Sequence, residues 1–109
     1  MGKYQLGEFE EIVLLTVGVL YDEAYGIAIK KEIEQQLDRK VSVGAMQSAL
    51  RRMEQKGYVK SRQGEVNSVR GGRPKRYFTI TAQGKQALEY SRDIRTKLWN
   101  QIPKTAFEI

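Results

Sequence analysis

Apolar residues recur at helical spacing in two stretches near the start of the chain. Residues 8–20 open with acidic side chains and then carry apolar residues on nearly every face, which is typical of a helix buried on more than one side. The valines in this stretch also suit a buried β-strand, which is the competing interpretation. In residues 24–37, Ile29, Ile33 and Leu37 share one face and charged residues occupy the other, which predicts an amphipathic helix.

A third helix is predicted over residues 43–56, between an N-cap at Ser42 and a terminating Gly57. Its apolar residues follow the i, i+3, i+4, i+7 pattern and should pack inward: Met46, Ala49, Leu50 and Met53. The opposite face carries small, amide and cationic side chains: Gly44, Gln47, Ser48, Arg51, Arg52 and Gln55. A helix with such an outer face suits the major groove of DNA, where Gln can read adenine and Arg can read guanine.

After residue 57 the apolar period changes from 3.6 residues to two. Residues 58–62 and 76–80 alternate and are rich in β-forming residues, which predicts two paired strands. The connection 63–75 contains three glycines and a proline, so it should form a loop. Thr81 suits the N-cap of a last helix that runs to Gln101, shortly before Pro103.

These elements predict a mainly α-helical fold with a small β-hairpin, namely a winged helix-turn-helix followed by one long C-terminal dimerisation helix. We expect residues 1–80 to form the winged helix-turn-helix. Residues 81–109 should form the dimerisation helix and a tail within the same structural unit. A length of 109 residues suits one such domain with a modest core.

The composition narrows the possible chemistry. The chain has no cysteine and no histidine, which excludes disulfides, thiolate zinc sites, Cys nucleophiles and histidine bases. Glu54 and Glu65 lie among positive charges but form no acid–base pair with a pocket. We therefore expect neither enzymatic activity nor a cofactor or metal. The longest apolar run, residues 12–20, is too short to span a bilayer and follows acidic residues, so we expect a cytoplasmic protein without membrane contact.

The positive charge is concentrated in one segment. The chain has a net charge of +6, and residues 51–76 alone carry +7 while the other 83 residues sum to −1. This segment includes the outer face of the third helix and the hairpin, and such a footprint is expected of a surface that binds phosphates. The residues predicted to contact double-stranded DNA are Ser42, Gly44, Gln47, Ser48, Arg51, Arg52, Lys60, Arg70, Arg73, Lys75 and Arg76. Among these, Gln47, Ser48 and Arg51 are expected to read bases.

Three separated motifs resemble the PadR family of bacterial transcriptional regulators. They are residues 25–27 (YGI), residues 41–44 (VSVG) with 49–59 (ALRRMEQKGYV), and residues 71–84 (GGRPKRYFTITAQG). The resemblance extends over about residues 7–90 and is closest to the short subgroup that ends in a single helix. One departure lies at Gly44-Ala45-Met46-Gln47, where family members commonly have Gly-Thr-Leu-Tyr. The hydroxyls expected at residues 45 and 47 are therefore missing.

The resemblance implies a winged helix homodimer, usually a repressor, whose C-terminal helix contacts the partner's N-terminal helix. The residues expected at this interface are Leu14, Val17 and Leu20 on one side and Leu88, Ile94, Leu98 and Trp99 on the other. The leading hypothesis is a sequence-specific transcriptional regulator, a repressor acting on an inverted-repeat operator. Some relatives sense phenolic or drug-like ligands, so one alternative is a sensor that binds a small aromatic effector at the dimer interface near Trp99. The other alternative is an adaptor that binds proteins through the winged helix.

Overall fold

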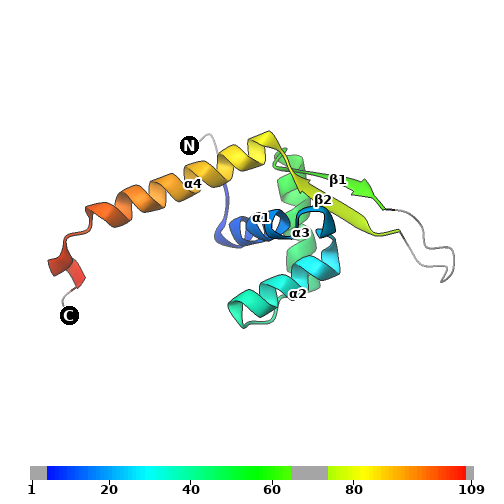
Figure 1. The fold of residues 1–109 in the computed structure, drawn as a ribbon, viewed down its shortest axis with the longest axis horizontal. Coiled ribbons are helices and arrows are strands. Elements are labelled where there is room, and N and C mark those ends of the chain that lie inside the picture. The colour runs from blue at the N-terminus through cyan, green and yellow to red at the C-terminus, as the bar shows by residue number, and fades with distance from the viewer. Residues whose placement is uncertain (1–4, 65–73, 108–109) are drawn as a thin grey trace.

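The computed structural model describes residues 5–64 and 74–107 and shows a helical body, a β-hairpin and a helix that projects from the body (Figure 1). Along the chain the elements are α1 (Glu8–Leu20), the 3-10 turn η1 (Tyr21–Glu23), α2 (Gly26–Leu37), α3 (Val43–Gln55), β1 (Val59–Gln63), β2 (Arg76–Ile80), α4 (Ala82–Gln101) and the 3-10 turn η2 (Lys104–Phe107). The predicted fold class, a mainly helical winged helix with a small hairpin, is confirmed.

The three helices of the body form close to where the apolar pattern places them. Residues 8–20 are helical, so the strand interpretation of this stretch is wrong. Helix α2 begins at Gly26, two residues after the predicted start at residue 24, because Tyr25 is extended and pairs with Tyr77 of β2 in an isolated bridge. Helix α3 has its predicted N-cap, since the Ser42 hydroxyl accepts a hydrogen bond from the Ala45 N–H. Gly57, which follows α3, has a φ of +82°, a conformation that favours glycine.

The core lies between α1, α2, α3 and the hairpin. Met46, Ala49, Leu50 and Met53 of α3 are all buried in it, as the spacing predicts. They pack with Ile29 and Ile33 of α2, Val13, Leu14 and Val17 of α1, and Val59 and Phe78 of the strands. Helix α1 is apolar on most sides because it contacts α2, α3, β2 and α4.

The hairpin is joined to the body by backbone pairing. β1 and β2 are antiparallel with Val59 opposite Ile80 and Gln63 opposite Arg76. The first strand begins and ends one residue later than the predicted range 58–62. The Phe78 N–H donates to the Ala24 carbonyl at 2.8 Å, next to the bridge between Tyr25 and Tyr77. The short extended segment before α2 therefore fixes the wing relative to the helix-turn-helix.

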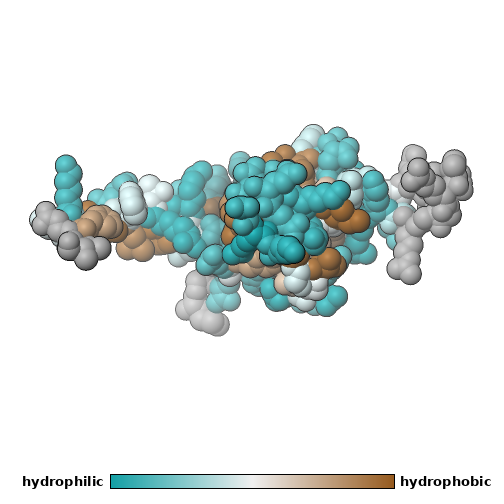
Figure 2. All heavy atoms as spheres, turned by 90° about the horizontal axis from the view of Figure 1, so that it is seen from below, coloured by the Kyte–Doolittle hydropathy of each residue, from teal (hydrophilic) through white to brown (hydrophobic). Residues whose placement is uncertain are grey.

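Helix α4 is buried against the body only in its first turns, and farther along it the Arg95 guanidinium contacts Glu11 of α1 at 3.1 Å. Thr81 caps it as predicted, and Gly84 and Ala87 are its buried residues. Residues 92–107 are exposed, and apolar atoms lie at the surface of this arm (Figure 2). Within the described ranges, no helix combines the length and the apolar content needed to cross a bilayer.

The structure corrects part of the expected dimer surface. Leu14 and Val17 are completely buried in the core of their own chain, so they have no surface to offer a partner. Leu20 and Leu88 are partly buried and pack against the same core. The large apolar residues of α1 that are exposed are Leu15 and Val19. The pattern of α1 did not separate these two groups because its apolar residues surround the helix.

Candidate nucleic-acid interface

The exposed face of α3 presents most of the residues predicted to contact DNA. Gln47 and Arg51 are exposed one turn apart, and Ser48 beside them is half-buried. Ser42 and Gly44 are exposed at the N-terminal end of the helix, where small side chains permit a close approach to the sugar–phosphate backbone. The buried face of α3 holds this surface in place, because Met46, Leu50 and Met53 pack into the core.

The base of the wing carries cations that aromatic rings hold in position. The Lys75 ammonium lies 4.2 Å from the centroid of the Tyr25 ring, and the Arg62 guanidinium lies 4.7 Å from that of Tyr77. The two tyrosine rings meet edge to face with their centroids 5.5 Å apart. This row of cation, ring, ring and cation links the wing to the start of α2. Sequence patterns predicted no contact among these residues: the hairpin register places Arg62 opposite Tyr77, and the bridge between Tyr25 and Tyr77 adds Tyr25.

Arg76 connects the wing to α3. Its guanidinium lies 3.5 Å from Glu54 Oε2, and the same oxygen accepts a hydrogen bond of 2.7 Å from the Ser61 hydroxyl. Both partners of the ion pair are exposed, so the attraction between them is weak. Lys60, on the neighbouring strand, is exposed and was also predicted to contact phosphate. Arg70 and Arg73 lie outside the described residues.

The structure gives Arg52 a different partner from the expected phosphate. Its Nε donates to Glu10 Oε2 at 3.0 Å, and the Lys56 ammonium contacts Glu10 Oε1 at the same distance. Burial raises the pKa of the Glu10 carboxyl, but hydrogen bonds from the Gly7 N–H, Arg52 and Lys56 outweigh that effect and lower its pKa below the usual value. The Arg52 side chain therefore joins α3 to α1.

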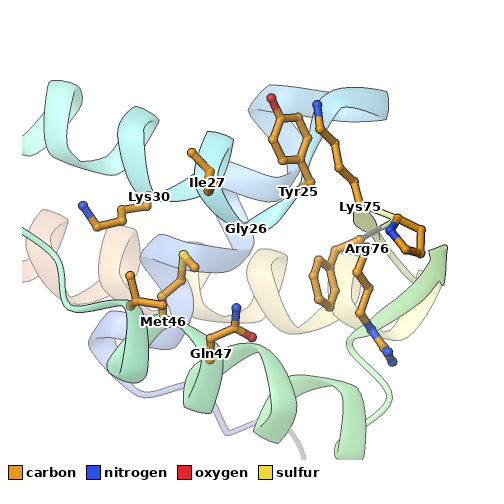
Figure 3. A pocket seen from close by; sticks show the side chains of 11 residues that line it. Tyr25, Gly26, Ile27, Lys30, Met46, Gln47, Lys75 and Arg76 are labelled. Atoms are coloured by element: carbon orange, nitrogen blue, oxygen red, sulfur yellow. The ribbon is translucent and has the colours of Figure 1, made fainter. Parts of the chain in front are cut away.

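A hollow of about 490 Å³ lies between α2, α3 and β2 (Figure 3). Ile27, Val43, Met46 and Phe78 supply apolar walls, while Lys30, Lys75 and Arg76 place positive charge around it. Gln47, Lys75 and Arg76, all predicted DNA contacts, meet at this hollow although they come from distant parts of the chain. In the part of the chain that the structure describes, no cluster of acidic side chains could hold a metal ion.

Comparison with known proteins places the chain among transcriptional regulators. The model of the transcriptional regulator PadR-like family matches residues 14–90. A solved PadR family transcription regulator from Clostridium difficile R20291 is 32% identical, with a TM-score of 0.61 over 83% of this chain and 95% of the other. A transcriptional regulator from Clostridium thermocellum is 26% identical, with a TM-score of 0.65 over 87% and 92% of the two chains.

A PadR-like transcriptional regulator from Bacillus cereus shares the fold at lower identity. It is 18% identical, with a TM-score of 0.71 over 93% of both chains. No curated protein matches the chain at a significant level.

Proposed function

The chain belongs to the PadR-like family of transcriptional regulators, and from this premise we propose that it is a repressor that binds an inverted-repeat operator as a homodimer. Such a protein acts on double-stranded DNA, which places it in the cytoplasm. The observation that carries the proposal is that the exposed polar face of α3 lies beside the cations of the wing. A helix for the major groove and a basic wing for the adjacent backbone are the two parts that a winged helix needs.

The proposed contacts follow from exposure and from the partners of each side chain. Gln47, Ser48 and Arg51 read base edges, because they occupy the outward face of α3. Lys60, Lys75 and Arg76 bind phosphates from the wing. Ser42 and Gly44 approach the backbone at the start of α3, and Arg70 and Arg73 are proposed as further contacts from the wing. Arg52 is left out, because the carboxylate that engages it, Glu10, is buried, whereas the Glu54 carboxylate beside Arg76 is exposed.

The exposed apolar residues of α1 and α4 support a homodimer. Leu98 is 60% exposed and Trp99 is 66% exposed, although both are large and apolar. Leu15 and Val19 of α1 offer a second exposed apolar surface, which fits the α4 arm of another copy. An exposed helical segment gains little stability from packing, so a partner that covers the apolar side chains of this arm would help to keep it ordered. Leu20, Leu88 and Ile94 are proposed at the same interface.

Binding to DNA from the region upstream of the protein's own gene tests the proposal. We expect a sequence preference over a scrambled duplex in about 0.2 M salt, where non-specific binding is weak. Replacing Arg51 by Ala should reduce the preference by about tenfold, the value of one base contact of about 1.4 kcal/mol. The control is Arg92→Ala, which removes the same charge from an exposed residue of α4 outside the proposed DNA contacts. It should leave the preference unchanged. Equal affinity for both duplexes would overturn the proposal.

A further inference from the structure

The hollow between α2, α3 and β2 lies inside the proposed interface rather than beside it. One of its sides is formed by Gln47 of α3 and another by Lys75 and Arg76 of the wing (Figure 3). The proposed function assigns Gln47 to base edges in the major groove, and Lys75 and Arg76 to phosphates of the adjacent backbone. A duplex that contacts α3 and the wing at the same time must therefore cover the hollow.

The lining of the hollow is unusual for a surface that only packs against protein. Ile27 is 64% exposed and Val43 is 53% exposed, and both lie in its wall rather than in the core or on the α1 and α4 surface. The lining residues include three cations, and within the described ranges they include no aspartate or glutamate. The hollow therefore offers apolar walls and positive charge to whatever enters it.

Lys30 contributes charge that the basic segment of residues 51–76 does not contain. It lies on α2, across the hollow from Lys75 and Arg76 (Figure 3). Its ammonium is held by Glu34, one turn later, at 3.1 Å, and Glu34 also accepts the Val41 N–H at 2.9 Å. Glu34 thus fixes the Lys30 side chain at the edge of the hollow instead of leaving it to move freely in solvent.

We infer that the hollow receives the sugar–phosphate strand that separates the two grooves, with Lys30 as a phosphate contact and Glu34 as its positioning residue. Deoxyribose has apolar C–H faces and each phosphate carries one negative charge, which match the apolar walls and the cationic rim. Ile27 and Val43 then contact deoxyribose. The inference rests on the proposed function, because it takes α3 and the wing to engage one duplex.

A pair of adjacent lysines provides the test. Lys30 lines the hollow and Lys31 does not, so Lys30→Gln and Lys31→Gln remove the same charge from almost the same place. Affinity is measured by fluorescence anisotropy across a salt series. The two DNAs are the upstream duplex that the wild type prefers and its scrambled control. We expect Lys30→Gln to weaken both complexes severalfold and to reduce the slope of log K against log salt by about 0.9, the value of one phosphate contact. Lys31→Gln should keep the wild-type slope, and Lys30→Arg should restore it.

A second substitution tests the apolar wall without changing any charge. Ile27→Ser should weaken both complexes and leave the salt slope unchanged, because no phosphate contact is lost. Equal slopes for Lys30→Gln and Lys31→Gln, or unchanged affinity for Ile27→Ser, would overturn the inference while the proposed function stands. Wild-type protein that shows no sequence preference would instead overturn the proposed function.

Discussion

The Glu10 carboxylate is the buried charge that joins the start of α1 to the end of α3. Its side chain is 6% exposed and accepts hydrogen bonds from Arg52, Lys56 and the Gly7 N–H. Because these donors lower the pKa of Glu10 below its usual value of 4.5, the ionised carboxylate stabilises the folded chain at pH values above 4.5. This contribution is lost as the pH falls through the pKa that Glu10 has in the folded state.

We expect Glu10→Gln to lower the free energy of unfolding by about 2 kcal/mol near neutral pH, since a buried hydrogen-bonded charge is removed. The difference from the wild type should shrink as the pH falls below 4.5 and through the lowered pKa of Glu10, where the carboxylate itself becomes protonated. Urea unfolding at a fixed protein concentration over a pH series measures both effects. Glu8→Gln, in the same turn but exposed, serves as the control. A difference that does not shrink at any pH below 4.5 at which the wild type still folds would contradict the role of the ionised carboxylate.

At the scale of elements, the junction between the hairpin and α4 decides where the C-terminal helix points. The Thr81 N–H donates to the Tyr58 carbonyl at 3.0 Å, and the Thr81 hydroxyl donates to the Gly57 carbonyl. Gly84 lies so close to Tyr58 that a Cβ atom at residue 84 would overlap the Tyr58 carbonyl oxygen. These contacts fix the first turn of α4 on the wing, and the rest of the helix follows that direction away from the body.

Gly84→Ala is therefore expected to force the first turn of α4 away from the hairpin. The overlap involves backbone on both sides, so it cannot be relieved by a side-chain rotation, and the free energy of unfolding should fall by about 3 kcal/mol. Gly44→Ala is the matched control, because a Cβ there meets only the Ser42 hydroxyl at 3.6 Å. Chemical denaturation compares the two variants. Equal stabilities would show that α4 does not depend on this close approach.

At the scale of the whole molecule, the exposed arm of α4 means that one chain does not cover its own apolar surface. Substitution of Leu98 by Glu should dissociate the proposed homodimer, because a charge would replace an apolar residue at the interface. Ile27→Glu changes a residue of nearly equal exposure, 64% against 60%, but on the side of the hollow, so the dimer should persist. Light scattering coupled to size-exclusion chromatography gives the mass of each variant. A wild-type monomer at micromolar concentration would contradict the dimer.

Local sequence patterns predicted the helices and strands of the winged helix. The period of apolar residues and the caps at Ser42, Gly57 and Thr81 were sufficient to predict the elements, because these signals act between residues close in the chain. The family was predicted separately, from the resemblance of three sequence motifs. The basic segment likewise predicted the face that we propose binds DNA. A helix boundary differs from its prediction where a distant strand pairs with the chain, as at Tyr25, which pairs with Tyr77 of β2 and is not helical.

Contacts between residues that are distant in the sequence could be identified only from the tertiary structure. Sequence patterns predicted Arg52 as a phosphate contact, and only the packing of α1 on α3 shows that the buried Glu10 is its partner within the chain. Leu14 and Val17 could not be told from Leu15 and Val19, because a helix that is apolar all round does not reveal which side its own core covers. The hollow near Lys30 exists only once α2, α3 and β2 meet. Local patterns thus determined the elements and the class of protein, whereas packing determined which side chains remain free to bind.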